Sequence, residues 1–277
     1  MIKTYKKEII FFYIASACAL IAAAFVDLRL DIWLNMPENP VAVWFRNTGE
    51  IPSRLICPFA GAAIFYTGYN KLQKTAGILF ALGGSAYLGY YIGKYFFIDE
   101  YKMAFSIVWG VGFGITVLIA GSFIKIPEKL KKPILITAVL GIAVMTAQLL
   151  AVEGMKALWG RVRFRDLLAQ GSYDEFTPWY CINGVNGNKS FPSGHTAGAG
   201  MSFLMMLFPF AFDKFKDKSR LCFAVPFVYT SVVAVTRLMM GAHYLSDVAM
   251  GGIISFTAAI IAVQIYCKVL PECRKDK

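Results

Sequence analysis

The sequence predicts an all-α membrane protein, a polytopic bundle of about eight helices. Of its 277 residues, 57% are hydrophobic and only 16% are charged, which is too apolar for a typical water-soluble domain. The apolar residues form continuous runs, most of them close to the roughly 20 residues that a spanning helix needs. These runs lack the two-residue alternation of a membrane β-barrel, so strands are excluded as the spanning elements.

Eight apolar runs are predicted to span the bilayer. In chain order they cover residues 9–26, 55–69, 76–97, 104–124, 133–152, 191–212, 221–240 and 248–269. The second run is the shortest. The connections are short except for residues 153–190, and a long loop in a compact protein is often functional. No linker or internal repeat divides the chain, so residues 1–277 are predicted to form a single membrane domain.

Basic residues predict the orientation of these spans. The net charge of +11 would suggest nucleic acid as the partner of a soluble protein, but here Lys and Arg occur in short clusters between apolar runs, which indicates membrane topology instead. With a cytoplasmic N-terminus, 17 of the 28 basic residues fall in cytoplasmic segments: Lys3, Lys6, Lys7, Lys71, Lys74, Lys125, Lys129, Lys131, Lys132, Lys214, Lys216, Lys218, Arg220, Lys268, Arg274, Lys275 and Lys277. Both chain ends are therefore expected in the cytoplasm.

Three polar stretches fall together on the extracytoplasmic side of this topology. They are KALWGRVRF at 156–164, FPSGHTAG at 191–198 and TRLMMGAHYLSD at 236–247, and they include both histidines of the chain. Lys156 and Arg163 are seven residues apart, so a continuous helix would place them on one face. His243 and Asp247 are four apart, a spacing at which the carboxylate can hold one imidazole nitrogen.

The third stretch also supplies a cation close to a histidine. Arg237 and His243 are six residues apart and would not share a face of a straight helix, but Gly241 permits a break that brings them together. Lys156, Arg163 and Arg237 then provide three cations at one level of the membrane. A phosphoryl group is the natural partner of such a cluster.

The middle stretch is predicted to open a helix. Pro192 suits the first helical position, and Ser193 and Gly194 offer backbone N–H groups that the helix does not use. The positive end of the helix dipole would add to an anion site there.

Each feature alone has a simpler interpretation. A solvated basic loop could contain Lys156, Arg161, Arg163 and Arg165, and Pro-Ser-Gly is ordinary helix capping. Aromatic residues of the long loop could anchor the chain at the membrane interface. Two histidines, an aspartate at helical spacing and three cations at one face are harder to explain as separate accidents, so together they favour a functional site.

These three stretches resemble the signature of the type 2 phosphatidic acid phosphatase family. That signature is Lys, six residues and Arg-Pro, then Pro-Ser-Gly-His, then Ser-Arg, five residues, His, three residues and Asp. Two positions depart from it, since Phe164 replaces the proline and Thr236 replaces the serine. Neither change removes a charged group or a histidine, but Phe164 permits a helix to continue past Arg163. The resemblance covers roughly residues 156–252.

The resemblance implies a role for each matched residue. His243 would be the nucleophile, Asp247 its orienting partner and His195 the acid that protonates the leaving oxygen. The phosphoryl oxygens would be held by Lys156, Arg163, Ser193, Gly194 and Arg237. The residue chemistry supports similar roles, since neutral imidazole can attack phosphorus and cations can stabilise the transition state without a metal. No cofactor and no metal are expected.

The family also implies an architecture of six core helices. Two of the predicted spans would then be additional and lie near the N-terminus, with residues 1–132 forming N-terminal spans and residues 133–269 the catalytic core. The stretch 31–49 mixes apolar and polar residues and could lie along the outer membrane interface.

The predicted function is a membrane-bound, metal-independent phosphatase that acts on a lipid through a phosphohistidine intermediate. Its substrate could be phosphatidate, phosphatidylglycerol phosphate, a polyprenyl pyrophosphate such as the undecaprenyl lipid, or a phosphorylated glycolipid such as lipid A. The alternatives are a lipid phosphotransferase with the same site and a lipid transporter. We expect the plasma (inner) membrane of a bacterium, with the site on its extracytoplasmic face and the bilayer and lipid as partners.

Overall fold

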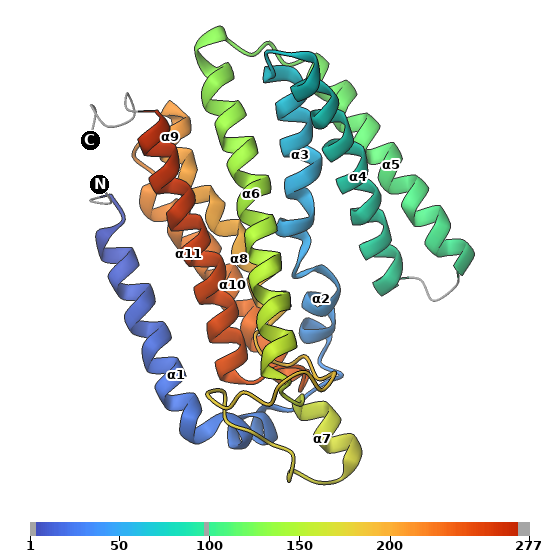
Figure 1. Ribbon diagram of the computed structural model, residues 1–277, viewed down its shortest axis with the longest axis vertical. Helices are drawn as coiled ribbons and strands as arrows, with labels where there is room; N and C mark the ends of the chain where they lie inside the picture. Colours follow the sequence, from blue (N-terminus) through green and yellow to red (C-terminus); the bar gives the residue numbers. More distant parts are fainter. Residues whose placement is uncertain (1–3, 97–99, 271–277) are drawn as a thin grey trace. The chain divides into compact units, whose positions relative to one another are not determined.

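A computed structural model describes residues 4–96 and 100–270, without the side chains of residues 100 and 101. The elements are α1 (Lys6–Leu34), α2 (Pro40–Thr48), α3 (Ile51–Thr67), α4 (Lys71–Phe96), α5 (Glu100–Ser122), α6 (Glu128–Trp159), α7 (Phe164–Gln170), α8 (Gly194–Gly200), η1 (Met201–Leu207), α9 (Phe208–Ala211), η2 (Asp213–Phe215), α10 (Ser219–Met239) and α11 (Leu245–Val269) (Figure 1). The described residues contain helices and no strand, which confirms the all-α prediction.

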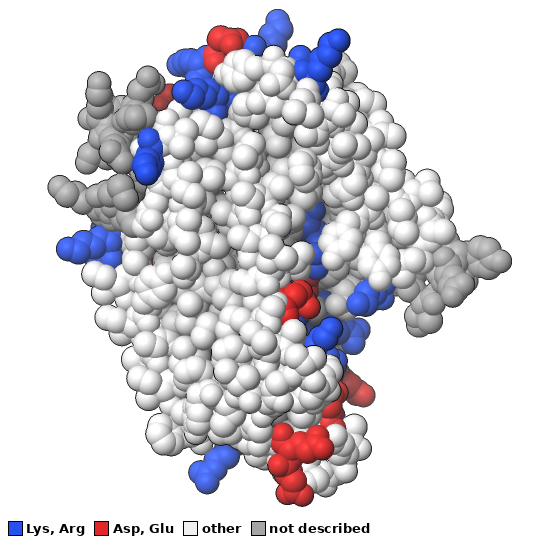
Figure 2. Space-filling model, viewed as in Figure 1, with Lys and Arg blue, Asp and Glu red and all other residues white. Residues whose placement is uncertain are grey.

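Six helical segments of the described chain are long and apolar enough to cross a membrane. They are Lys6–Leu34, Lys71–Phe96, Lys102–Ser122, Glu128–Gln170, Ser219–Met239 and Leu245–Val269. Uncharged side chains cover most of the face drawn in Figure 2, as expected for a surface in contact with lipid. The chain is therefore an integral membrane protein, as predicted.

The other two predicted spans take shorter forms. Residues 55–69 fall largely within α3, which has 17 residues. Residues 191–212 are divided among α8, the 3₁₀ helix η1 and α9, so they form no continuous α-helix. Three glycines within α8 and a proline at the start of α9 lower the helical stability of this segment.

The described chain forms two compact units that interleave along the sequence. The first takes in the described parts of Met1–Glu50, Ala147–Met206 and Lys218–Ile260, and the second those of Ile51–Thr146, Leu207–Asp217 and Ile261–Lys277. Every predicted site residue belongs to the first unit. The predicted division of one membrane domain at residue 132 stays a prediction.

Aromatic side chains form the centre of the first unit. Phe12 of α1 stacks on Phe256 of α11, with ring centroids 4.0 Å apart, and meets Phe203 of η1 edge to face at 5.7 Å. Phe203 also lies 6.1 Å from Phe223 of α10. Nearby, the Tyr5 hydroxyl donates to the carbonyl of Met206. These contacts attach α1 to the helices that carry the predicted motifs.

Small residues allow the helices of the second unit to approach closely. A Cβ at Gly77 of α4 would lie 2.7 Å from the Gly61 carbonyl of α3, and a Cβ at Gly89 of α4 would lie 3.0 Å from the Cα of Gly110 in α5. Helix pairs in membranes associate through such close backbone packing, because apolar side chains gain little from leaving lipid. Figure 1 shows α3, α4 and α5 side by side.

The stretch 31–49 forms the end of α1, a short link and the helix α2. The Asn39 side chain caps α2 by accepting hydrogen bonds from the N–H groups of Val41 and Ala42, at 3.0 and 3.3 Å. Ala42 is fully buried against Met240 and Ala242, in the connection between α10 and α11. This packing places α2 beside the third motif.

Candidate active site

The first motif spans the end of a helix instead of continuing through it. Helix α6 ends at Trp159, and Gly160 follows with a φ of +52°, a left-handed conformation that favours glycine. Lys156 therefore lies in the last turn of α6, while Arg163 lies in the extended segment before α7. The expectation that these two cations share one helical face was wrong, because Gly160 ends the helix; the continuation past Arg163 that Phe164 would permit does not occur, and a separate helix, α7, begins at Phe164.

The second motif opens α8 two residues later than predicted, at Gly194. Ser193 is the N-cap, its Oγ accepts from the Thr196 N–H at 3.3 Å, and Pro192 precedes the cap. The Ser193 N–H donates to the backbone carbonyl of Asp247 at 2.9 Å. Pro192 is thus not the first helical residue, and the Ser193 amide joins α8 to α11 in this structure instead of pointing to an open anion site.

Lys156 and Gly194 nevertheless lie next to each other. A Cβ built on Gly194 would lie 3.0 Å from Lys156 Nζ, so the absence of a side chain makes room for the ammonium group. Lys156 also forms an ion pair with Glu153 at 2.6 Å, and its side chain is mostly buried. The first and second motifs therefore converge.

The third motif turns sharply, as its glycine predicted. Helix α10 ends at Met239, and Gly241 has a φ of +57°. The Gly241 carbonyl accepts from the Arg165 N–H at 2.8 Å, and the Ala242 N–H donates to the Arg237 carbonyl at 3.1 Å. Arg237, only 4% exposed, is held at the end of α10 within electrostatic range of His195 and His243.

The ring of His243 is fixed by a backbone carbonyl that sequence reasoning missed. Its Nδ1 lies 2.8 Å from the carbonyl oxygen of Ser190 and 3.5 Å from Asp247 Oδ2. A carbonyl can only accept, so Nδ1 carries the proton and Nε2 has the free lone pair. The predicted pairing of His243 with Asp247 is present at ion-pair distance, but His243 precedes α11, so the two residues do not share a helical face.

Asp247 accepts three hydrogen bonds in the site. Its Oδ2 accepts from the Ser190 hydroxyl at 2.5 Å and from the Tyr244 N–H at 3.0 Å, while Oδ1 accepts from Arg161 Nη1 at 2.7 Å. Tyr244 directly precedes α11, so Asp247 also caps the first turn of that helix. These bonds hold the carboxylate fully buried beside His243.

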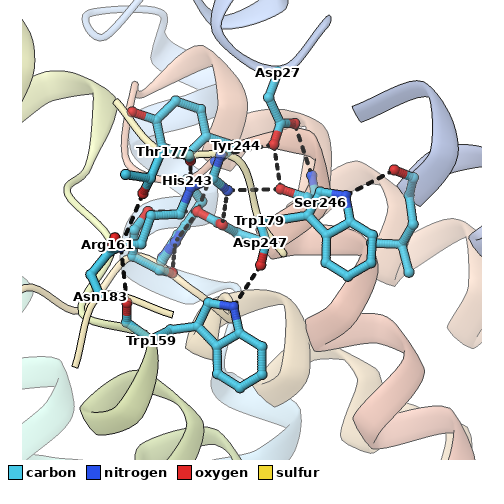
Figure 3. Close-up of polar contacts among 12 residues, drawn as sticks. Asp27, Trp159, Arg161, Thr177, Trp179, Asn183, His243, Tyr244, Ser246 and Asp247 are labelled. Atoms are coloured by element: carbon cyan, nitrogen blue, oxygen red, sulfur yellow. Dashed lines mark hydrogen bonds and ion pairs between the residues drawn. The ribbon is translucent and has the colours of Figure 1, made fainter. Parts of the chain in front are cut away.

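Arg161 links the site to the first helix, which the sequence did not predict. Its Nη2 pairs with Asp27 of α1 at 3.0 Å and its Nη1 pairs with Asp247, while Ser246 donates to Asp27 through both its N–H and its hydroxyl. Arg161 is fully buried, so its interpretation as part of a solvated loop was wrong. Figure 3 shows the guanidinium between the two carboxylates. Asp27, a carboxylate in an apolar run, was the available signal.

The long loop covers this network and positions Ser190. The Arg161 Nε–H donates to the Thr177 carbonyl at 2.8 Å, and the Ser190 N–H donates to the Arg161 carbonyl at 3.0 Å. The Trp159 indole donates to the Trp179 carbonyl, and both indoles pack against Phe191. The long loop thus places the Ser190 carbonyl against His243, which supports its predicted functional role.

Burial controls the charge of His243. The side chain is 3% exposed, and this burial is the main reason why its pKa falls from 6.5 to about 4. Asp247 raises the pKa, while the positive charges of Arg237 and Arg163 lower it. The net result is a neutral imidazole at physiological pH, which is the form that can act as a nucleophile.

His195 lies within the first turn of α8, and both of its ring nitrogens face residues outside the three motifs. Nδ1 lies 3.0 Å from Glu50 Oε1, and Nε2 lies 3.2 Å from the carbonyl oxygen of Arg46. No motif or spacing pointed to Glu50, because its position beside His195 depends on tertiary packing alone.

The possible metal ligands of the site are its His, Cys, Asp and Glu side chains. Within residues 4–96 and 100–270, no group of three His, Cys, Asp or Glu side chains is arranged to hold a metal ion. Besides the carboxylates of Glu50 and Asp247, the positive charges of Arg237 and Arg163 act on the imidazoles, and such cations suit the site to an anionic ligand.

Comparison with known proteins gives one match. Residues 135–270 match the family model of the PAP2 superfamily, and this segment includes all three motifs. No curated protein and no solved structure matches the chain. The match confirms the resemblance inferred from the motifs.

Proposed function

We propose that this membrane protein of the PAP2 superfamily hydrolyses the phosphate monoester or pyrophosphate of a lipid, through a phosphohistidine at His243. One observation carries the proposal. The Ser190 carbonyl, 2.8 Å from Nδ1, fixes the tautomer that leaves the Nε2 lone pair of a buried, neutral imidazole ready to attack phosphorus. Asp247 then stabilises the positive charge that develops on the ring during attack.

Cations supply the charge stabilisation in this mechanism. Lys156, Arg163 and Arg237 would hold the non-bridging oxygens of the phosphoryl group, whose negative charge is spread over three oxygens in the transition state. Support comes from the closeness of Lys156 to Gly194 and from the electrostatic action of both arginines on His243. Because these fixed charges do the work that magnesium does elsewhere, we propose that hydrolysis is metal-independent.

His195 is proposed to protonate the leaving oxygen. The P–O bond to the lipid breaks as the P–N bond to His243 forms, and the proton passes from His195 to the lipid alcohol or phosphate. Water then attacks the phosphohistidine, His195 recovers a proton, and inorganic phosphate leaves.

A lipid substrate is supported by an apolar cavity in the first unit. This cavity, of about 230 Å³, lies between α1, α10 and α11, and Thr196 and Leu245 are part of its lining. Thr196 follows His195 directly, so a hydrocarbon chain in the cavity would have its head group near the imidazoles. The proposed substrate is one of four lipid classes: phosphatidate, phosphatidylglycerol phosphate, polyprenyl pyrophosphates or phosphorylated glycolipids.

We also propose that the site faces away from the cytoplasm, in the plasma (inner) membrane of a bacterium. Three helices each carry a predicted cytoplasmic basic residue at one end: Lys6 in α1, Arg220 in α10 and Lys268 in α11. The site residues Asp27, Arg237 and Asp247 lie towards the opposite ends of the same helices. The basic ends are expected in the cytoplasm.

The deciding experiment measures phosphate release by the purified protein from a panel of these lipids, with excess EDTA and with vanadate. Activity that survives EDTA and falls with vanadate, which mimics trigonal-bipyramidal phosphorus, is expected. Transfer of phosphate to an added lipid alcohol without net release would identify a phosphotransferase. Lipid movement without any cleavage would identify a transporter, and activity that requires magnesium would refute metal independence.

A further inference from the structure

The ring of His195 makes two contacts that restrict its protonation. Glu50 Oε1 lies 3.0 Å from Nδ1 and the Arg46 carbonyl lies 3.2 Å from Nε2. The side chains of His195 and Glu50 are 14% and 11% exposed, so bulk water contributes little to either. Both partners precede residue 135, where the match to the PAP2 superfamily begins.

These contacts fix the number of protons that His195 and Glu50 hold together. The Arg46 carbonyl only accepts, so Nε2 must carry a hydrogen. A neutral imidazole then presents a lone pair at Nδ1, which can face Glu50 only if the carboxyl group is protonated. If the carboxylate is ionised, Nδ1 must carry a hydrogen as well, and the ring is an imidazolium. In either case the pair holds one proton more than a neutral imidazole with an ionised carboxylate.

We propose that Glu50 is a positioning residue that keeps His195 supplied with the proton for the leaving group. This inference rests on the proposed function. As the bond between phosphorus and the lipid oxygen breaks, the Nε2 proton of His195 bonds to that oxygen and the proton shared with Glu50 ends on Nδ1. The pair is left as neutral imidazole and carboxylate. Water that later attacks the phosphohistidine returns one proton to the pair and adds its hydroxyl group to phosphorus as the P–N bond to His243 breaks, so atoms and charge balance.

The other charges around His195 explain why such a partner is needed. Burial and the positive charge of Arg237 both disfavour an imidazolium at this position, and His243 acts in the same direction when it is protonated. Glu50 is the carboxylate that opposes them. The pKa of His195 nevertheless falls to about 3, so the additional proton of the pair lies on the Glu50 carboxyl group and faces the Nδ1 lone pair.

The turn that carries Glu50 is anchored to α10. The Tyr229 hydroxyl lies 3.4 Å from the carbonyl oxygen of Thr48 and 3.2 Å from that of Gly49, the two residues before Glu50. Gly49 packs so closely that an added Cβ would lie 3.1 Å from Val233 Cγ1. Tyr229 and Arg237 are two helical turns apart on α10, so one helix fixes both the carboxylate and a phosphoryl-binding cation.

The test compares Glu50→Gln with Glu38→Gln, an exposed glutamate on the same N-terminal connection, on two substrates. On a lipid phosphate, whose alcohol leaves poorly, E50Q should lower kcat at least about tenfold with KM changed less than about threefold. On p-nitrophenyl phosphate, whose leaving group needs little protonation, E50Q should stay within about threefold of wild type. The alkaline limb of the lipid kcat profile should move to lower pH in E50Q, and E38Q should match wild type throughout.

Equal losses on both substrates with an unchanged pH profile would overturn the inference, and so would no loss on either. If E50Q does not fold, Glu50→Asp retains a retracted carboxylate, and Tyr229→Phe removes the hydroxyl that anchors the turn. Each should lower lipid turnover selectively, and an equal loss on both substrates would refute the proposal. Failure of the wild-type protein to release phosphate from any lipid would instead refute the proposed function itself.

Discussion

Arg161 is the residue on which the charge balance of the buried site depends. It is fully buried, it pairs with Asp27 and Asp247, and its guanidinium carbon lies 4.1 Å from the ring centroid of Tyr244. A buried ion pair adds little to stability compared with apolar packing, but loss of one partner leaves an uncompensated buried charge. Arg161 is therefore needed to neutralise the buried carboxylates of Asp27 and Asp247.

Replacement of Arg161 should therefore be costly. Arg161→Ala leaves two buried carboxylates without their cation, and we expect the folding free energy to fall by about 3–5 kcal/mol. The thermal unfolding midpoint in detergent measures this, with Arg165→Ala, whose side chain is about half exposed, as the matched control. A midpoint for R161A equal to that of R165A would contradict the assigned role.

The protonation of His243 gives a second prediction at the residue scale. Its pKa of about 4, set mainly by burial, means that the imidazole of this proposed nucleophile stays neutral as the pH falls from 7 towards 5 and becomes protonated only near pH 4. Arg163→Gln removes a charge that lowers this pKa, so the acidic limb of kcat/KM for p-nitrophenyl phosphate should move to higher pH. Arg165→Gln is the control, and because the substrate titrates equally in all three proteins, the difference reports His243. An acidic limb near pH 6.5 in the wild-type protein would contradict the burial argument.

Replacement of His243 and replacement of His195 should reduce activity in different ways. His243→Ala removes the attacking nitrogen and should abolish turnover of both lipid phosphate and p-nitrophenyl phosphate, along with any covalent phosphoenzyme. His195→Ala should abolish lipid turnover but retain much of the p-nitrophenyl phosphate activity, since that leaving group needs little protonation. Phosphate release and acid-quenched labelling measure these effects. Equal losses for both variants on both substrates would show that the two roles are assigned wrongly.

Among the residues of the site, those with a motif were predictable and those without were not. Lys156, His195 and His243 stand in recognisable patterns, and the structure brings their segments together. Arg161 and Asp27 are 134 residues apart, and no local spacing relates them. The Ser190 contact to His243 uses a backbone carbonyl, which carries no side-chain signature at all.

At the scale of elements, glycines set the distance between helices in the second unit. Gly89 of α4 and Gly110 of α5 face each other, and an added Cβ at either would collide with backbone atoms of the other helix. Gly83 of α4 and Gly112 of α5 lie on the same helices, yet no described atom lies within 4 Å of a Cβ built there. Substitution of Gly89 or Gly110 therefore tests close helix packing, whereas substitution of Gly83 or Gly112 tests helix propensity alone.

These pairs give an element-scale prediction. Gly89→Ala and Gly110→Ala should each destabilise the protein by about 1–3 kcal/mol through overpacking. Gly83→Ala and Gly112→Ala should be neutral or raise stability by up to about 1 kcal/mol, since alanine favours the helix. Thermal unfolding in detergent reports both. If all four variants behave alike, the close contact between α4 and α5 does not exist.

Hydropathy predicted where helices lie but not where they stop. The apolar runs match α1, α4, α10 and α11 well, because the length of a span is imposed by the bilayer. The end of α6 at Trp159 was missed, since Gly160 adopts its positive φ only because the long loop packs there: Asn186 donates to its carbonyl at 2.7 Å. The division of residues 191–212 into three short helices likewise depends on tertiary contacts, which hydropathy does not report.

At the scale of the whole molecule, the proposed topology is open to direct test. Val185, in the long loop, is 84% exposed, whereas Lys129 lies at the start of α6, at the opposite end of that helix from Lys156. In a background with Cys181→Ser, Val185→Cys should react with a membrane-impermeant thiol reagent added outside intact cells. Lys129→Cys should react only after permeabilisation. The reverse pattern would place the site in the cytoplasm.

The span of Arg161's partners along the chain has a consequence for biogenesis. Asp27 of α1 is synthesised before Arg161, and Asp247 of α11 is synthesised after it. A nascent chain that has not yet received α11 lacks one of the two carboxylates that neutralise this arginine, and it also lacks His243. Since the proposed nucleophile is missing, we expect such a chain to release no phosphate, and an arrested or truncated chain carries an arginine with incomplete charge compensation that membrane proteases can recognise.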